Sequence, residues 1–441
     1  MTHTILRAPR AALLRMTSAL ALLAATAACN EFLTATNPGA VEEKDVNIPA
    51  NVDILTFGAV TTYQFSHSEI TYWNAQLTDE LFNRAVFAEE GEIDRRNLFS
   101  DMTYINAFMY GPAQRARYAG DDAAARLKVI LGDTASRDHR LARALAYAGH
   151  SYIDLGEMMC TTPIDLGVPK TSEEMFADAI TRFQEAIAVA TAAKTYLQSR
   201  TPVSAPAVAG TDSVRYFALV GAARAALNRD DKAAAIAFAT QVPAGFEFRA
   251  YYSDNTTAQR NRVFERITLA SNAYLLNTPF LAMTTDPRIP RIPGTTGRAY
   301  TPLSPPSYST FTNTLAGGVF TPIMSVRVAS GLEAQYIIAE AQGPTAATLT
   351  FVNTRRAAGQ QTPVTLAGDA LMAELRDQRS RDFYLDNHRL GDLRRYLKYY
   401  QVDLFPKGPY PGSTSGQTYN ETITCWPLPT NEINGNPNIP K

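Results

Sequence analysis

The sequence predicts a mainly α-helical protein: tetratricopeptide-like helical hairpins in one large domain with long irregular loops. Two observations favour this fold class: apolar side chains recur every three or four residues in neighbouring segments, and a helix-capping motif opens the second of these segments. The length agrees with this fold class, because 441 residues with 46% apolar and 19% charged types can bury a large core. The net charge is only −1, so nucleic acid is not expected as a partner.

The N-terminus has the features of an export signal. Residues 1–28 contain Arg7, Arg10 and Arg15, no acidic residue, and then an apolar or small run too short to span a bilayer. The run ends in small residues directly before Cys29, which is similar to a bacterial lipobox. We expect residues 1–28 to be a cleaved lipoprotein signal peptide and Cys29 to carry the lipid anchor, with ordinary signal cleavage as the alternative.

A single domain is expected over residues 29–441. Its first part, 31–111, predicts an irregular lead-in followed by helices, including 52–65 and 71–87. No other run approaches about 18 consecutive apolar residues, so no further membrane-spanning segment is expected in the chain.

A helical hairpin is predicted around residues 137–193. The apolar face of its first helix runs from Leu141 to Met159, and Thr171 to Glu174 form a capping box that opens the second helix. Small residues at set distances from aromatic ones, as in Gly149-x2-Tyr152 and Ala179-x3-Phe183, match the tetratricopeptide pattern with a loop inserted between the helices.

Two more such pairs are predicted, around 213–242 and around 331–358. In the first of these, Gly221 and Ala233 stand at the 12-residue offset of the repeat. Three stacked pairs would bury a continuous core.

Between the second and third pairs lies a proline-rich, irregular segment, 278–322. It is expected to be either a functional loop or a connector packed on the helices. A second irregular segment is the tail, 400–441, in which Trp426 is expected to anchor the chain.

The two remaining cysteines, Cys160 and Cys425, form an even pair in a chain that is expected to be exported. A disulfide between them and two buried free thiols are both compatible with the sequence. A bridge would join the tail to the first hairpin across a long loop.

The C-terminal motifs carry a resemblance to a known family. They are Glu333-Ala334-x-Tyr336 followed by Ile337 to Ala341, then Arg379-x2-Asp382-Phe383-x2-Asp386-Asn387-x-Arg389-x2-Asp392-Leu393-x-Arg395, and finally Pro427-x-Pro429-x2-Glu432-Ile433 with Asn436-Pro437. Together with the lipobox and the inserted hairpin, this set resembles the SusD/RagB family of outer-membrane nutrient-binding lipoproteins. Asn387 stands where that family has glycine, and asparagine tolerates the left-handed backbone that such a glycine adopts. The charged residues of the second motif are expected to form a structural network that fixes the C-terminal helix against the repeats.

No catalytic constellation is recognisable in the sequence. The five histidines have no zinc-hydrolase spacing, and nucleophile-elbow, phosphate-loop and dinucleotide motifs are absent. Neighbouring carboxylates such as Asp79 and Glu80, or Glu89 and Glu90, could serve glycoside cleavage, but solvated surface charges are the more ordinary interpretation. We therefore expect no enzyme activity, no metal site and no cofactor.

Aromatic rings outside the repeats are the candidates for a recognition surface, because tyrosine and tryptophan combine a flat apolar face with a hydrogen-bonding group. The candidate ligand-binding residues, for each of which packing is the alternative, are Tyr72, Trp73, Asp79, Arg84, Tyr104, Tyr300 and Tyr308.

The resemblance implies a protein anchored by lipid to the outer membrane and facing the cell surface. It would bind an oligosaccharide or another polymer fragment and deliver it, uncleaved, to a SusC-like, TonB-dependent barrel. Two other functions are compatible with the sequence: a periplasmic tetratricopeptide scaffold for protein partners, and a secreted glycoside hydrolase.

Overall fold

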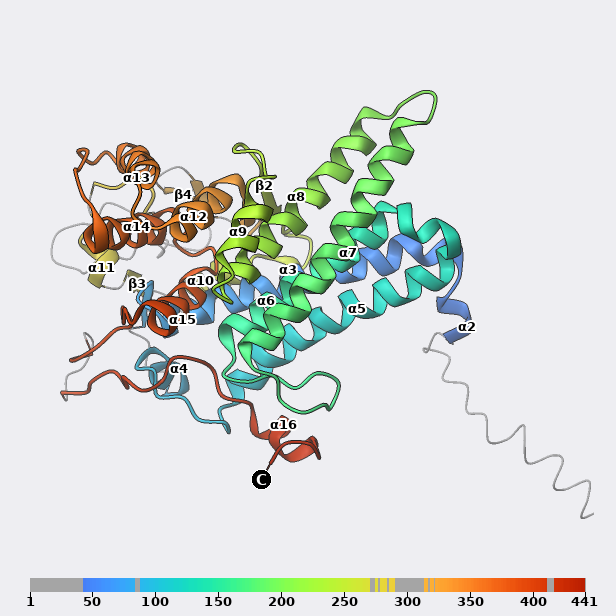
Figure 1. Cartoon of the computed structure of the whole chain (residues 1–441). Coiled ribbons are helices and arrows are strands. Elements are labelled where there is room, and N and C mark those ends of the chain that lie inside the picture. Colours follow the sequence, from blue (N-terminus) through green and yellow to red (C-terminus); the bar gives the residue numbers. More distant parts are fainter. Residues whose placement is uncertain are drawn as a thin grey trace, which may run out of the picture. The chain divides into compact units, whose positions relative to one another are not determined.

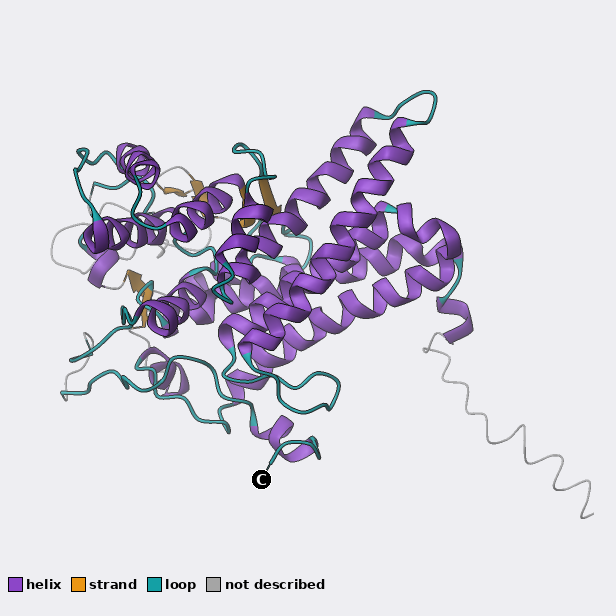
Figure 2. Ribbon diagram, viewed as in Figure 1, coloured by secondary structure: helices purple, strands orange, loops and turns teal. Residues whose placement is uncertain are grey.

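The computed structural model describes residues 43–83, 88–269, 274–276, 278–283, 285–289, 313–315, 318–320, 322–410 and 416–440. The chain divides into two units, Met1–Asn51 and Val52–Lys441. Of the first unit, only α2 (Glu43–Val46) and the 3-10 turn η1 (Pro49–Asn51) are described. The second unit is mainly helical, which confirms the predicted fold class (Figure 2). The expected signal peptide and Cys29 lie outside the described residues.

Five long helices form the centre of the second unit (Figure 1). They are α3 (Val52–Leu77), α5 (Gly111–Leu131), α6 (His139–Met158), α7 (Ser172–Gln198) and α8 (Ala205–Leu227). Each packs against the next along the chain, and α3 also packs against α6. Two short elements introduce α5 and α6: the π-helical η2 (Ile105–Tyr110) and the 3-10 turn η3 (Gly132–Arg137). Alanine and glycine are frequent in these helices, so the backbones can approach closely.

The first predicted hairpin corresponds to α6 and α7, and the predicted capping box is present at Thr171 and Glu174. The small residues of the repeat pattern lie where two helices meet one ring. A Cβ atom added at Gly149 would lie 2.6 Å from the Phe183 ring, and one added at Gly221 of α8 would lie 2.3 Å from it. The Phe183 ring of α7 is therefore held between glycines of α6 and α8, which explains the spacing seen in the sequence.

The helix predictions for the N-terminal part were wrong in one respect. The sequence indicated two helices, 52–65 and 71–87, and the polar stretch Ser66 to Glu69 lies between these ranges. The structure has one continuous helix, α3, followed by strand β1 (Leu81–Asn83) and helix α4 (Ala88–Asp94). The polar stretch continues the helix because its side chains are buried against partners far along the chain: His67 contacts Asp154 at 3.3 Å, and Glu69 accepts a hydrogen bond from Arg262 at 2.8 Å.

The C-terminal part adds shorter helices beside α8. The second predicted pair corresponds to α8 with α9 (Lys232–Ala239), and the third to α12 (Gly331–Gln342) with α13 (Ala346–Ala358). Then follow α14 (Gly368–Asp382), α15 (Arg389–Tyr400) and α16 (Thr430–Gly435). Asn387, between α14 and α15, has a φ of 60°, as expected for the residue that stands in place of a glycine.

Strands contribute little to the described residues. Each of three sheets has two antiparallel strands: β1 with β3 (Tyr274–Leu276), β2 (Glu247–Ala250) with β6 (Val326–Ser330), and β4 (Asn313–Leu315) with β5 (Gly318–Phe320). The remaining elements are the 3-10 turn η4 (Thr257–Gln259), α10 (Arg262–Leu269) and α11 (Thr278–Leu281). Only parts of the proline-rich segment 278–322 are described, and Tyr300 and Tyr308 are not among them.

The tail is attached to the helical body by covalent and polar contacts. Cys160, just after α6, is joined to Cys425 by a disulfide, which is one of the two alternatives that the sequence left open. The neighbouring Trp426 is fully buried, and its Nε1 donates a hydrogen bond of 2.8 Å to Asn74 Oδ1 on α3. The prediction that Trp426 anchors the tail is confirmed.

Within the part of the chain that the structure describes, no helix has the length and apolar character needed to cross a membrane.

Candidate functional site

A cluster of aromatic rings lies where α3 meets η2. Tyr104 and Phe108 are partly exposed and surround the buried Trp73 of α3. The ring centroids of Trp73 and Phe108 are 5.7 Å apart with an interplanar angle of 11°, and Tyr104 meets both rings edge-on, at 5.1 Å from Trp73 and 5.2 Å from Phe108. Such offset and edge-to-face arrangements stabilise one another, so the two outer rings form a fixed surface.

The backbone beneath this cluster has an unusual conformation. Ile105–Tyr110 form a π-helical turn, and the N–H of Gly111 donates to the carbonyl oxygen of Asn106, five residues back. A Cβ atom at Gly111 would lie 2.5 Å from that oxygen, so a glycine is needed for the turn to join α5 without a clash. Short π-helical turns inside helices occur frequently at functional sites, where they re-aim side chains. Here the turn carries Phe108 and directly follows Tyr104.

Two arginines from α10 border the rings. The Arg266 guanidinium lies 4.1 Å from the centroid of Phe108 and 5.4 Å from that of Trp73, and Arg262 lies 5.4 Å from the Phe65 centroid. Both arginines pair with the buried carboxylate of Glu69, at 2.8 Å from Arg262 and 3.2 Å from Arg266. One carboxylate thus fixes two guanidinium groups beside three aromatic rings.

Tyr104 supplies the polar group of this surface. Burial, together with the nearby carboxylates of Glu90 and Glu89, raises the pKa of Tyr104, so its hydroxyl stays protonated at neutral pH. Among the described residues this hydroxyl has no hydrogen-bond partner, whereas the backbone N–H of Tyr104 donates to Glu89 at 3.3 Å. The Tyr104 hydroxyl can therefore donate to, or accept from, a ligand that lies on the rings.

Tyr104 is the one candidate ligand-binding residue among those described that contributes to this surface; the other candidates are buried or lie outside the described residues. Tyr72 and Trp73 are completely buried, so they pack in the core, the alternative that the sequence left open. Asp79 accepts two hydrogen bonds from Arg389, at 2.6 and 2.5 Å, and is also buried. Tyr104 is the predicted residue that lies at a surface. Arg84, Tyr300 and Tyr308 lie outside the described residues.

The sequence analysis did not single out Phe65, Phe108, Glu69, Arg262 or Arg266. A signal was present, because Phe65, Glu69 and Trp73 stand at four-residue intervals and so share one face of α3, and Arg262 and Arg266 share one face of α10. What the sequence could not indicate is that these two faces meet.

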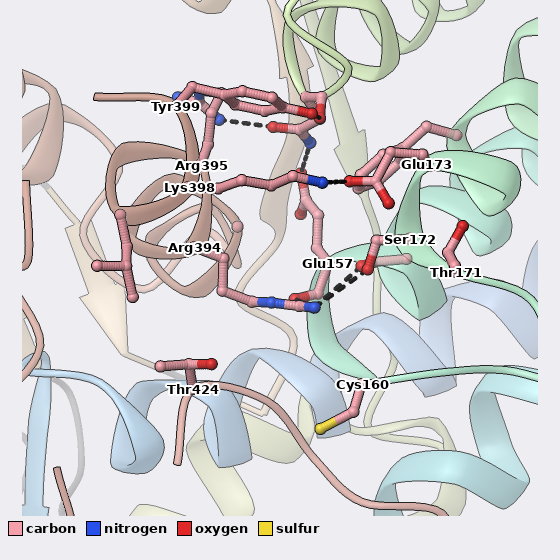
Figure 3. A pocket seen from close by; sticks show the side chains of 15 residues that line it. Glu157, Cys160, Thr171, Ser172, Glu173, Arg394, Arg395, Lys398, Tyr399 and Thr424 are labelled. Carbon is pink, nitrogen blue, oxygen red and sulfur yellow. Dashed lines mark hydrogen bonds and ion pairs between the residues drawn. The ribbon is translucent and has the colours of Figure 1, made fainter. Parts of the chain in front are cut away.

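A pocket of about 410 Å³ lies between the end of α6, the start of α7, α15 and the tail (Figure 3). Its cations are already paired. Lys398 of α15 forms an ion pair with Glu173 of α7, and Arg394 donates to Ser172 Oγ at 3.0 Å and to the carbonyl oxygens of Gly156 and Met159 at 3.0 Å each. Burial lowers the pKa of Arg394 to about 10. These contacts attach α15 to the first hairpin. The residues that line the pocket are therefore better explained by packing between these helices than by ligand binding.

The charged signature forms the structural network that the sequence predicted. Arg395 pairs with Asp392 at 2.7 Å and with Glu340 of α12 at 2.8 Å, and Arg379 pairs with Asp392 at 2.7 Å. Burial would raise the pKa of Asp392, but the two guanidinium groups hold it below its ordinary value. Asp382 and Asp386 pair instead with Arg355 and Arg327, at 2.7 and 2.6 Å. The network connects α12, α13, α14, α15 and β6.

Within the described residues, no three His, Cys, Asp or Glu side chains gather in a way that could hold a metal ion.

Comparison with known proteins places the fold. Residues 338–441 match the sequence model of the SusD family. The structure resembles a SusD superfamily protein from Bacteroides fragilis, with a TM-score of 0.63, 14% identity, and coverage of 89% of this chain and 99% of that one. It also resembles a SusD-like carbohydrate-binding protein from Bacteroides vulgatus, with a TM-score of 0.62, 12% identity, and coverage of 89% and 97%.

A third similar structure is surface glycan-binding protein A from Bacteroides uniformis, with a TM-score of 0.61, 11% identity, and coverage of 89% and 98%. No curated protein sequence matches the chain. At these identities the likeness shows a shared fold, and the matched C-terminal segment contains the charged signature from Arg379 to Arg395. Residues 338–441 thus match the SusD family, and the chain shares the fold of the SusD superfamily structures.

Proposed function

We propose that this protein is a surface lipoprotein that binds a glycan, or another fragment of a polymeric nutrient, and passes it uncleaved to a SusC-like, TonB-dependent barrel in the outer membrane. The observation that carries the binding part is the partly exposed pair of rings, Tyr104 and Phe108, with Arg266 beside them. Proteins of the same fold that are described as carbohydrate-binding support the choice of ligand.

The chemistry of the surface suits a sugar. The apolar face of a pyranose ring, formed by its C–H groups, can lie on an aromatic ring, while its hydroxyls need donors and acceptors at the edge. Tyr104 offers its protonated hydroxyl there, and Arg266 offers guanidinium N–H groups, with about 20% of its side chain exposed. Because the rings and Arg266 are held by one another and by Glu69, little side-chain entropy is lost on binding.

Glycan binding is testable on the purified protein. A glycan array would first identify a ligand, and calorimetry would then compare wild type with Tyr104→Ala and Phe108→Ala. Each stacking contact is worth roughly 0.5–1.5 kcal/mol, so each variant should bind about 2- to 12-fold more weakly. Tyr118→Ala is a matched control, because Tyr118 is an exposed ring on α5 that lies outside the cluster. Equal affinities of wild type, both cluster variants and the control would contradict the proposed site.

Cell-surface attachment and delivery to a barrel rest on the lipobox and on the family resemblance. Purification from outer membranes of the source cells should recover the protein with a lipid on Cys29 and in a complex with a β-barrel protein. Recovery of the protein alone would contradict the partnership. Protection of the protein from protease added to intact cells would instead favour the periplasmic scaffold.

Binding without cleavage is testable on the same ligand. Incubation with the recognised polysaccharide should leave its chain length unchanged. Release of shorter products that depended on Glu89 or Glu90, the two neighbouring carboxylates beside Tyr104, would favour the hydrolase alternative.

A further inference from the structure

A second pocket lies on the same side of α3 as the ring cluster, about three turns toward the N-terminus of the helix. Its volume is about 300 Å³. The residues that line it come from α3, α5 and the 3-10 turn η4: Thr61, Thr62, Phe65, Pro112, Arg115 and Ala258. The loop that carries Ala258 is attached to α3, because the Tyr252 hydroxyl donates to the carbonyl oxygen of Gln64 at 3.1 Å. The wall of this pocket is thus held in place.

The pocket and the ring cluster are joined by a chain of partly exposed side chains. Phe65 lines the pocket and lies under Arg262, Arg262 shares Glu69 with Arg266, and Arg266 lies over Phe108 of the ring cluster. The exposed fractions of the Arg262 and Arg266 side chains are 17% and 20%. The two arginines are four residues apart on α10. Arg262 lies over Phe65 and Arg266 lies over Trp73, and both of these rings belong to α3.

The length of this surface can be obtained from helix geometry. From Thr61 to Trp73, α3 rises about 18 Å at about 1.5 Å per residue. Within it, Phe65 in the pocket and Trp73, on which Phe108 stacks, are separated by a rise of about 12 Å, which is longer than one sugar ring. The pattern fits an extended chain better than a single compact ligand.

The lining of the pocket is suited to hydroxyl groups. The Thr61 and Thr62 hydroxyls donate to the carbonyl oxygens of Phe57 at 3.0 Å and Gly58 at 2.7 Å, so their remaining lone pairs can accept. Arg115 is exposed and forms no ion pair within the described residues, so its N–H groups can donate. With the Phe65 ring as a platform, the pocket offers a face, acceptors and donors to one sugar unit.

We infer that this pocket is a second sugar subsite, and that the protein takes a linear oligosaccharide along α3, with one unit on Tyr104 and Phe108 and a later unit against Phe65. This inference rests on the proposed glycan-binding function and specifies its ligand as a chain long enough to reach both positions.

The test is a series of linear oligosaccharides of increasing length, cut from the polysaccharide that the wild-type protein recognises and measured by calorimetry. Affinity of the wild type should increase at the length that first spans both positions. Ala258→Leu fills the pocket from an exposed position, so it should remove that increase in affinity. The variant should bind the long oligomers about 3- to 10-fold more weakly than the wild type and bind the short oligomers with the same affinity. Ala258→Ser keeps the pocket open and should behave like the wild type.

Arg115→Gln provides an independent variant, because it changes an exposed lining side chain that comes from another element, α5. It too should weaken binding of long oligomers only. If the wild type bound all lengths equally, or if Ala258→Leu and Arg115→Gln bound long oligomers as the wild type does, the second subsite would be refuted, while loss of binding in Tyr104→Ala would still support the proposed function. If the wild type bound no oligosaccharide, both would fail.

Discussion

Glu80 gives the protein a pH-dependent stability that a single substitution should remove. The side chain is 2% exposed, and its Oε1 accepts a hydrogen bond of 2.8 Å from the backbone N–H of Leu385. Burial raises the pKa of Glu80 from 4.5 to about 8; the neighbouring Asp79 adds to the increase, and the Leu385 N–H and Arg389 oppose it. Glu80 is therefore protonated in the folded protein at neutral pH but ionised in the unfolded chain.

The sign and size of the effect follow from this difference. Between pH 4.5 and about 8 the unfolded chain gives up a proton that the folded protein keeps, so the free energy of unfolding decreases as pH rises. At about 1.4 kcal/mol per pKa unit, the full decrease is at most about 5 kcal/mol. Glu80→Gln keeps the acceptor for Leu385 and cannot ionise. Its stability relative to wild type should therefore be near zero at pH 4.5 and increase to a few kcal/mol above pH 8.

Urea unfolding followed by far-UV circular dichroism at pH 5, 7 and 9 would measure this difference. Glu185→Gln is the control, because Glu185 is a surface residue paired with Lys128, and its effect should be small and nearly independent of pH. A Glu80→Gln variant whose difference from wild type stayed constant across this range, or that became less stable at high pH, would refute the reasoning.

Two further perturbations test how the scaffold is held together. Replacing both Cys160 and Cys425 with serine should lower the free energy of unfolding by about 4–5 kcal/mol, because their sequence separation is 265 residues and the bridge restricts a long loop of the unfolded chain; in urea, a midpoint equal to that of the oxidised wild type would contradict this. Gly221→Ala should destabilise by about 1–2 kcal/mol, since the new Cβ would lie 2.3 Å from the Phe183 ring and the clash exceeds the gain in helix propensity. The comparison variant is Ala222→Gly, which lies one residue along the same buried helix and removes a methyl group instead of adding one. A Gly221→Ala variant that was more stable than wild type would rule out the close packing of Gly221 on Phe183.

The sequence predicted the hairpins well because their signals are local. The apolar period in α6, the capping box at Thr171 and the glycines that meet Phe183 all depend on neighbours within a few turns or on a known repeat spacing. The prediction of two helices, 52–65 and 71–87, in place of the continuous α3 failed for the opposite reason. His67 and Glu69 are buried polar residues whose partners, Asp154 and Arg262, are 87 and 193 residues away in the sequence.

The candidate site was predictable only in part for the same reason. Tyr104 could be proposed from its residue type and its position outside the repeats. Phe108 and Arg266 become significant only because a π-helical turn aims one and Glu69 positions the other. Trp73 shows the converse, since an aromatic ring outside the repeats can equally form the base on which the surface rings pack.

A crystal structure of the protein with a recognised oligosaccharide would test the central claim most directly. The account predicts intact sugar density against Tyr104 and Phe108, with hydroxyls within hydrogen-bond distance of Tyr104 Oη or of the Arg266 guanidinium. Sugar bound instead in the pocket between α7 and α15, with the Tyr104 and Phe108 rings bare, would contradict it.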